Sequence, residues 1–275
     1  MSWSYFLFAL PALALTKLPL IYRAGDALPE HSAFHRWIVR QMRRRVTRVV
    51  CNSEFVARRF NRLGFAPVVI HNHPPLRLEE KAVALPAKIS GAVQLIYIGQ
   101  IAKHKGIALL VETVIGLIRD GLNVTLLVAG DSVWGDPLRK ELEETVHHAS
   151  ATDRIHFLGA VENVPSVLRA SDVHVCPSIW DDPSPNVIVE AKREGIPTVA
   201  FPVGGIPELI EHEVDGYLCH EVSAEGLGAG VRYFLEASRR RAAGQAAHQK
   251  YETNFGFSSF QRQWIEIVSR AGPPC

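Results

Sequence analysis

The chain has 275 residues, of which 47% are hydrophobic and 21% are charged, a composition typical of a globular protein that excludes a largely disordered chain. The formal net charge is +2, yet residues 1–80 carry twelve Lys and Arg against five Asp and Glu, so basic residues are concentrated near the amino terminus. The four cysteines have no paired short spacing, which argues against a disulfide framework or a zinc site and favours a reducing cytoplasm.

Residues 1–20 are apolar and aromatic, as in a signal peptide or a membrane span. No Lys or Arg precedes the apolar run, and Pro11, Lys17 and Pro19 interrupt it before it reaches the roughly 20 apolar residues that a span needs. We therefore predict a buried helix followed by a strand, with a membrane anchor as the alternative.

Residues 18–22 and 46–51 predict two strands, with a helix over residues 32–45 between them. Apolar residues recur at helical spacing on one side of this helix, namely Phe34, Trp37, Ile38 and Met42. The opposite side is basic and holds Arg36, Arg40, Arg43 and Arg44. A basic side of this kind either binds an anionic membrane or a phosphorylated ligand, or is simply solvated.

Residues 76–90 predict a linker, because Pro74, Pro75 and Pro86 and the charges between them interrupt helical and strand periodicity. From residue 93 onward, short apolar runs alternate with helical patterns, which is typical of a parallel sheet covered by helices on both faces. The predicted strands are residues 94–98, 124–128, 154–157, 173–176 and 198–201. The fold class is therefore α/β, with a Rossmann-like unit.

A final helix is predicted to close the chain. Apolar residues recur on one side of it, namely Phe260, Trp264, Ile267 and Val268. The chain is therefore expected to close on an amphipathic helix.

The segment from Gly99 to Gly106 leaves a predicted strand and enters a helix near Lys105. A helix start presents unpaired backbone N–H groups and the positive end of the helix dipole, and both attract phosphate. Lys105 adds a full positive charge there. A glycine after a strand with a surface lysine is also a common structural pattern, so a purely structural role stays open.

Asp182 and Glu190 are eight residues apart and follow the predicted strand at residues 173–176. With Asp182 in a loop and Glu190 on the next helix, both carboxylates can line the carboxyl edge of the sheet, where open α/β folds bind ligands. Carboxylate oxygens accept charge-assisted hydrogen bonds from sugar or ribose hydroxyls. Two acids also occur at this spacing by chance.

Gly204 and Gly205 lie between a further strand and a helix, and Glu208 falls in the first turn of that helix. Paired glycines let the backbone come close to a ligand. The alternative is a plain strand-to-helix turn in which Glu208 interacts favourably with the helix dipole.

These three segments, in this order, resemble the donor domain of family 4 glycosyltransferases, which are retaining enzymes of the GT-B type. The resemblance covers about residues 95–218. Further matching elements are Val128-Ala129-Gly130, Phe157-Leu158-Gly159, Gly195-Ile196-Pro197-Thr198-Val199 and Asp215-Gly216-Tyr217-Leu218.

The resemblance implies a GT-B-like fold with two Rossmann-like domains. The donor domain, with its parallel sheet, would occupy residues 83–240, and an incomplete acceptor domain would occupy residues 1–82. Residues 241–275 would form a helical segment that packs back toward the acceptor domain.

The resemblance also implies roles for individual residues. Lys105 would contact the donor diphosphate, Asp182 the transferred sugar and Glu190 the nucleotide ribose, so Lys105 and Asp182 are the expected catalytic residues. The other expected donor-binding residues are Gly99, Gln100, Asn186, Val187, Gly204 and Gly205. Basic residues and helix dipoles offset the charge of the leaving diphosphate in this family, so neither a metal nor a cofactor is expected.

Three positions depart from the family pattern. Gln100 stands where arginine is common, which removes a positive charge that Lys103 replaces in part. Asp182 is one methylene shorter than the usual glutamate, and Gly25 stands where a histidine often precedes the aspartate of the acceptor domain. These departures bear on how strongly the diphosphate and the sugar are held.

Residues 51–54 and 69–74 resemble later elements of the family's acceptor domain. The beginning of that domain has no counterpart, so we expect the chain to be truncated at its amino terminus. His71 and His73 alternate on an extended segment, as two metal ligands can, but a domain-junction loop is the preferred interpretation.

The leading prediction is transfer of a hexose-like sugar from a nucleoside diphosphate sugar to a hydroxyl acceptor, lipid-linked or saccharide, with retention at the anomeric carbon. No nucleic-acid partner is expected. The protein is expected in the cytoplasm, where its basic helix would let it bind peripherally to an anionic membrane. Two other functions stay open, namely an inactive nucleotide-sugar-binding remnant and a nucleotide-sugar epimerase of the same architecture.

Overall fold

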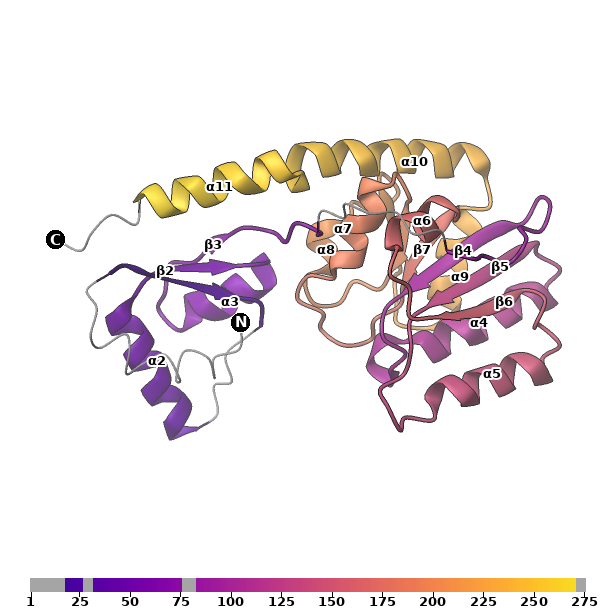
Figure 1. The fold of residues 1–275 in the computed structure, drawn as a ribbon, viewed down its shortest axis with the longest axis horizontal. Helices are drawn as coiled ribbons and strands as arrows, with labels where there is room; N and C mark the ends of the chain where they lie inside the picture. Colours follow the sequence, from indigo (N-terminus) through magenta and orange to yellow (C-terminus); the bar gives the residue numbers. More distant parts are fainter. Residues whose placement is uncertain (1–17, 27–31, 76–82, 271–275) are drawn as a thin grey trace. The chain divides into compact units, whose positions relative to one another are not determined.

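The computed structural model describes residues 18–26, 32–75 and 83–270. The chain divides into a smaller unit, residues 1–73 and 254–275, and a larger unit, residues 74–253 (Figure 1). The helix expected within residues 1–17 lies outside the described residues. Each unit is an α/β structure with its own parallel sheet.

The larger unit is built on a six-stranded sheet in the order β6-β5-β4-β7-β8-β9, in which all neighbouring strands are parallel. The strands are β4 (Val93–Ile98), β5 (Val124–Ala129), β6 (Ile155–Gly159), β7 (Val173–Cys176), β8 (Thr198–Ala200) and β9 (Gly216–Leu218). The predicted α/β class and the five predicted strands are confirmed, with strand ends within two residues. β9 was not predicted because three residues are too few to show a pattern.

Helices cover both faces of this sheet. They are α4 (Ile107–Arg119), α5 (Leu138–His148), α6 (Val164–Arg169), α7 (Asn186–Arg193), α8 (Ile206–Leu209), α9 (Ala224–Tyr233) and α10 (Ala237–Lys250). Helices α4, α5 and α9 pack on one face, and α6 and α7 pack on the other (Figure 1). This is the doubly covered sheet that the alternating sequence pattern indicates.

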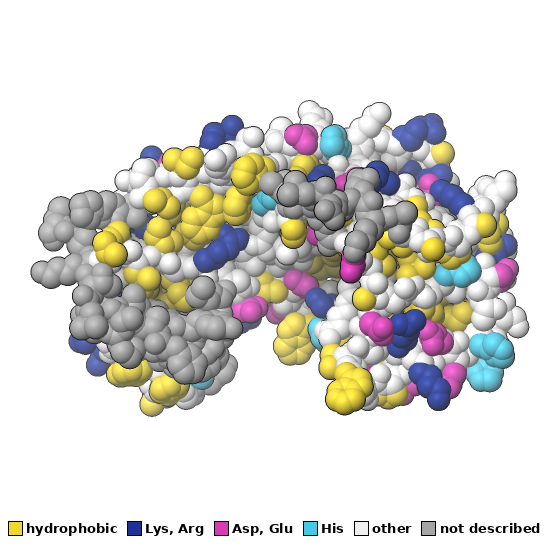
Figure 2. Space-filling model, in the orientation of Figure 1, with side chains coloured by type: hydrophobic (Ala, Val, Ile, Leu, Met, Phe, Trp, Pro, Cys, Tyr) yellow, Lys and Arg dark blue, Asp and Glu magenta, His cyan; other side chains and the backbone are white. Residues whose placement is uncertain are grey.

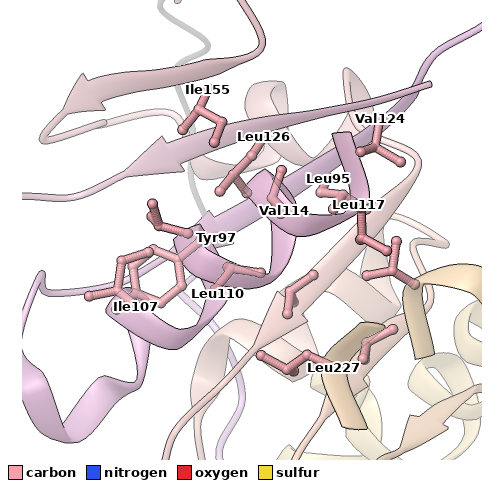
Figure 3. Close-up of a cluster of buried hydrophobic side chains, with 14 of the residues drawn as sticks. Leu95, Tyr97, Ile107, Leu110, Val114, Leu117, Val124, Leu126, Ile155 and Leu227 are labelled. Atoms are coloured by element: carbon pink, nitrogen blue, oxygen red, sulfur yellow. The ribbon is translucent and has the colours of Figure 1, made fainter. Parts of the chain in front are cut away.

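Successive side chains of β4 enter two different cores. Leu95 and Tyr97 face α4, where they meet Leu110 and Val114 (Figure 3). Ile96 lies between them in the sequence and packs on the α6 side. Burying each of these apolar side chains stabilises the fold by roughly 1.5–3 kcal/mol. Because both faces are covered, the strand reads as an unbroken apolar run.

The strand order creates a switch point between β4 and β7. From β4 the chain continues through β5 to β6 on one side, and it then crosses to β7 on the other side of β4. The connections that leave the carboxyl ends of β4 and β7 therefore diverge, and open α/β sheets bind ligands in the crevice between such connections.

The smaller unit holds a three-stranded parallel sheet in the order β1-β2-β3. Its elements are β1 (Leu20–Ala24), α2 (Ala33–Arg45), β2 (Val46–Cys51), α3 (Glu54–Arg62), β3 (Val68–Val69) and α11 (Phe257–Arg270). Ser32 caps α2, because its hydroxyl accepts from the N–H of His35. Strand β1 begins two residues later than the strand predicted at residues 18–22.

The apolar stripe predicted on α2 is only half buried. Ile38 and Met42 are 1% and 0% exposed and pack with Tyr22 in the core, whereas Phe34 and Trp37 are 52% and 46% exposed. Phe34 lies in the first turn, and Trp37 is rotated by about 120° from the centre of the buried side at 100° per residue. Their rings stack on each other instead, with centroids 6.1 Å apart.

Helix α11 belongs to the smaller unit. Its Ile267 packs with Val50 and Ile70, and Trp264 joins the same cluster. Val268, which belongs to the same predicted apolar stripe, is 59% exposed. Figure 2 shows apolar side chains gathered over this helix. No helix of the described ranges has the length and apolarity to cross a membrane.

The domain boundaries differ from those expected at residues 82 and 240. The larger unit runs from residue 74 to residue 253. It includes α10 because this helix packs on α7 and β9. The approach is close: a Cβ atom on Gly244 would lie 2.3 Å from the carbonyl oxygen of Gly195. The polar composition of α10 gave no sign of this packing.

Candidate functional site

The segment that starts at Gly99 is shaped by close backbone contacts at the end of β4. The N–H of Gly99 donates to the carbonyl of Ala129, 3.0 Å away. A Cβ atom on Gly130 would lie 1.8 Å from the carbonyl oxygen of Gly99, so only glycine fits at residue 130. Gly130 therefore lets the ends of β4 and β5 approach each other closely.

Contacts around Lys105 join the connection after β4 to the connection after β7. Lys105 ends a short 3₁₀ turn, and Gly106 follows with a left-handed φ of 69°. A Cβ atom on Gly106 would lie 1.8 Å from the carbonyl oxygen of Pro177. The N–H of Ile179 donates to the carbonyl of His104, 3.1 Å away. Glycine at residue 106 is what lets these two segments touch.

Lys105 and Asp182 meet across the switch point. Nζ of Lys105 lies 2.7 Å from Oδ2 of Asp182, and the two side chains are 30% and 14% exposed. The residues are 77 positions apart, and the neighbouring places of β4 and β7 bring them together. Partial burial strengthens such a pair relative to a surface pair, while the remaining exposure lets a ligand reach it.

The loop with Gly204 and Gly205 packs against the same aspartate. The N–H of Gly205 donates to the backbone carbonyl of Asp182, 2.9 Å away. A Cβ atom on Gly204, which has a φ of 60°, would lie 2.3 Å from that oxygen. Oδ1 of Asp182 accepts from the N–H of Ser184, 3.3 Å away. The paired glycines therefore let two loops approach and hold Asp182 in place.

Helix α7 starts four residues after Asp182. Its first two residues, Asn186 and Val187, are exposed and half-buried. The first turn of α7, which carries the positive end of the helix dipole, therefore follows Asp182 closely along the chain. A helix start of this kind favours a bound anion. Glu190, one turn along, is half-buried. It lies opposite Lys192 on the helix, and Lys192 is buried.

Two polar positions of the first segment lie at the surface, beside the buried Ile101 and Ala102. The side chains of Gln100 and Lys103 are exposed. The carbonyl of Gln100 accepts from the Tyr97 hydroxyl, 2.6 Å away, which fixes the backbone just before the turn. Of the expected site residues, direct contacts thus unite Lys105, Asp182, Gly204 and Gly205, while Gly99 and Gln100 shape the approach to them.

Two residues at this edge gave no signal in the sequence. Ser184 is 8% exposed and lies between Asp182 and α7. Cys176 ends β7, and burial together with the nearby Asp182 carboxylate raises the pKa of its thiol to about 11. Cys176 therefore stays protonated at neutral pH and is a poor nucleophile. No short spacing marks either residue, because Cys176 is placed by the end of β7 and Ser184 by the packing of the loop that follows.

His71 and His73 lie in the smaller unit, where they contact aromatic rings. Nδ1 of His71 is 3.1 Å from the carbonyl oxygen of Asn52, and the ring packs on Phe255 with centroids 5.3 Å apart. His73 packs on Phe257 at 5.5 Å. Within the ranges that the structure describes, no group of three or more His, Cys, Asp or Glu side chains is arranged to hold a metal ion.

A groove of about 710 Å³ lies elsewhere in the larger unit, between α4, α5 and α9. Lys105, Asp182 and Glu190 are not among its lining residues. The candidate site is therefore defined by its contacts and by the strand topology.

Comparison with known proteins matches residues 83–250 to the family described as "Glycosyl transferases group 1". Spore coat protein SA of Bacillus subtilis (strain 168) is 26% identical over 191 residues, covering 66% of this chain and 50% of that protein. The 2-deoxystreptamine glucosyltransferase of Streptomyces kanamyceticus is 30% identical over 195 residues, covering 66% of this chain and 48% of that enzyme. The chain thus spans about half the length of these curated relatives.

The fold is similar to that of Anabaena HepE in complex with UDP, with a TM-score of 0.85 and 22% identity over 98% of this chain and 77% of that chain. This likeness concerns the fold alone, and it confirms the predicted GT-B-like, Rossmann-like fold class. The family match covers more than half of the chain and contains every residue of the candidate site. The chain therefore belongs to the group 1 glycosyl transferases.

Proposed function

We propose that this chain provides the donor site of a retaining glycosyltransferase of family 4, which transfers a hexose from a nucleoside diphosphate sugar to a hydroxyl acceptor. The observation that carries the proposal is the Lys105–Asp182 pair, 2.7 Å apart at the switch point of the sheet. The Lys105 ammonium can bind phosphate, and the Asp182 carboxylate can accept hydrogen bonds from sugar hydroxyl groups. The pair lies at the edge of the sheet where such folds bind ligands. Family membership supports the reaction class.

Each site residue has a distinct part in this proposal. The Lys105 ammonium and the first turn of α7, at Asn186 and Val187, hold the diphosphate. Asp182 accepts hydrogen bonds from the transferred sugar, and Glu190 accepts them from the ribose. Gly204 and Gly205 keep the backbone close to Asp182.

The chemical step in this proposal is departure of the nucleoside diphosphate. Negative charge grows on the diphosphate as the glycosidic bond breaks, so positive groups fixed beside it stabilise the transition state more than the ground state. Lys105 and the α7 dipole supply that charge, and we propose that no metal or cofactor is required. Gln100, in place of the family's usual arginine, makes Lys105 the principal side-chain cation of the proposed site.

Two relatives support a more specific donor. One is a 2-deoxystreptamine glucosyltransferase, and the solved Anabaena structure is a complex with UDP. We therefore propose UDP-hexose as the donor class and a saccharide or lipid-linked hydroxyl as the acceptor. The buried thiols Cys51, Cys176 and Cys219 suit a reducing cytoplasm.

The exposed arginines of α2 support peripheral contact with an anionic membrane. Arg36, Arg40, Arg43 and Arg44 are all exposed, and Trp37 is exposed beside them. Each arginine near an anionic surface contributes about 1 kcal/mol, and an interfacial tryptophan adds apolar anchoring.

Calorimetry with UDP, uridine and UDP-glucose tests the proposed site. Replacing Lys105 by alanine should weaken UDP binding about tenfold or more, because a charge-assisted contact to phosphate is lost, and should leave uridine binding unchanged. The matched control is Lys103→Ala on the same turn, for which we expect a smaller loss. Equal loss for uridine and UDP would show that Lys105 supports the loop and not the ligand.

An assay with UDP-glucose and candidate acceptors tests the reaction. Release of UDP with a glycosylated acceptor of retained configuration supports transfer. An isomerised donor would instead identify an epimerase, and donor binding without turnover would identify an inactive remnant.

A further inference from the structure

A buried cluster of charges lies behind the helix that carries Glu190. Nζ of Lys192 is 2.9 Å from Oδ2 of Asp215, and each of these two side chains is 1% exposed. Nζ of Lys250 is 2.9 Å from the same oxygen and is 23% exposed. The other carboxylate oxygen of Asp215 accepts from the N–H of Glu211, 2.9 Å away. Two ammonium groups therefore share one buried carboxylate.

The cluster links three elements of the larger unit. Lys192 is on α7, Asp215 directly precedes β9, and Lys250 is the last residue of α10. Lys192 follows Glu190 by two residues, so it points away from the proposed ligand edge at 100° per residue. Behind the helix, Nδ1 of His248 lies 2.8 Å from the carbonyl oxygen of Arg193, which ties α7 to α10 a second time.

The two carboxylates that offset Lys192 and Lys250 differ in burial. Glu211 lies 3.9 Å from Lys250, but its side chain is 64% exposed. Glu194 is paired elsewhere, with Arg193 and Arg169, each 3.0 Å away. Of the two carboxylates that offset Lys192 and Lys250, Asp215 is thus buried and Glu211 is largely exposed, where solvent weakens its attraction. A buried, incompletely compensated charge destabilises a fold relative to an apolar side chain of the same size, whereas it fixes one arrangement of its partners.

We propose that Lys192 is a positioning residue, which through Asp215 and Lys250 holds α7 in the one orientation that presents Glu190 to the ribose of the donor. The inference rests on the proposed function of Glu190. An apolar residue at 192 would still pack, but α7 would lose its ionic link to β9, and Glu190 would sample more than one position.

This arrangement makes nucleotide binding sensitive to pH. Burial lowers the pKa of Lys192 to about 8, with Asp215 opposing that shift and Lys250 adding to it. When the proton leaves, Asp215 keeps its ion pair with Lys250, and its link to Lys192 on α7 weakens from an ion pair to a neutral hydrogen bond. Nucleotide affinity should then fall in mildly alkaline solution, while a permanently charged side chain at 192 should prevent the fall.

The experiment compares UDP affinity from pH 7 to pH 9 in the full chain and in three variants, Lys192→Met, Lys192→Arg and Lys140→Met. Lys140→Met is the matched control, because Lys140 is 82% exposed on α5. The unchanged chain should lose about fivefold in affinity over this range, the equivalent of one net hydrogen bond. Lys192→Met should be weaker by that factor already at pH 7 and independent of pH. Lys192→Arg should bind well throughout.

Measurements of unfolding and of hydrogen exchange distinguish a positioning role of Lys192 from a general contribution to stability. Lys192→Met should be no less stable than the unchanged chain at pH 7, yet amide exchange over residues 186–193 should be faster. Loss of stability and affinity together, or a pH dependence that persists in Lys192→Met, would overturn the inference. So would unchanged exchange over α7, whether or not UDP binds. If the unchanged chain binds no UDP at any pH, it is the proposed function that fails, and exchange over α7 still decides the role of Lys192.

Discussion

Lys105 and Asp182 neutralise each other in the absence of a donor. Their 2.7 Å contact means that a diphosphate must compete with the Asp182 carboxylate for the Lys105 ammonium. Glycine at residues 106 and 204 makes this geometry possible, because a side chain at either position would collide with backbone of the loop after β7. The residues expected to bind two parts of one ligand are thus already in contact with each other.

Replacing Asp182 by asparagine should therefore leave UDP affinity unchanged or raise it by up to about fivefold. The reason is that the ion pair with Lys105, worth about 1 kcal/mol, no longer competes with the diphosphate. The affinity for UDP-glucose should fall relative to the affinity for UDP, since the contact between residue 182 and the sugar is weakened. Asp181→Asn, at the exposed neighbouring residue, is the control. Calorimetry with both ligands checks the prediction, and weaker UDP binding in Asp182→Asn would contradict it.

At the scale of elements, α7 connects the proposed ligand edge to the interior. Its first turn lies at the carboxyl edge of the sheet, Glu190 is half-buried, and Lys192 reaches Asp215 behind it. A helix of eight residues has little stability of its own, so its orientation depends on these tertiary contacts.

The low pKa of Lys192 predicts how stability depends on pH. Above about pH 8 the folded chain releases the Lys192 proton, whereas the unfolded chain holds it until about pH 10.5. The unfolded state then binds more protons, so stability rises with pH relative to Lys192→Met, by at most about 1.4 kcal/mol per pH unit. Urea unfolding of both proteins at pH 7, 8 and 9 measures this difference. A difference that stays constant would refute the pKa shift.

Helix α2 presents arginines together with an exposed tryptophan. We expect salt-sensitive binding to vesicles that contain anionic lipid, and this binding should fall by about tenfold or more when Arg40, Arg43 and Arg44 become glutamine. Trp37→Ala should weaken vesicle binding by the same factor at low and at high salt, because the contribution of Trp37 is apolar. Sedimentation with anionic and neutral vesicles measures both effects. Equal binding to both kinds of vesicle would remove the electrostatic explanation.

At the scale of the whole molecule, every residue of the proposed donor site belongs to the larger unit, residues 74–253. That unit has its own six-stranded sheet, covered on both faces. The smaller unit is completed by α11, whose Ile267 and Trp264 pack against β2 and the segment after β3.

Residues 74–253 expressed alone should fold and bind UDP within about threefold of the full chain, a difference below 1 kcal/mol. Transfer to an acceptor should be absent, because the fragment lacks the proposed acceptor domain. Circular dichroism and calorimetry on the fragment check this, with Glu190→Gln in the fragment as the control for specific binding. A loss of UDP affinity much above tenfold would show that residues outside the fragment complete the site.

Sequence alone determined the α/β class, five strands of the larger sheet and the three segments that form the proposed donor site. Strands buried on both faces read as unbroken apolar runs, and Ser32 marks the start of α2, because both signals are local. Only the tertiary structure decided that Lys105 touches Asp182, that Phe34 and Trp37 are exposed, and that Lys192 is buried. A helical period shows which side of a helix is apolar but not how far the neighbouring sheet reaches. Contacts between residues 77 apart depend on strand order, which local periodicity does not encode.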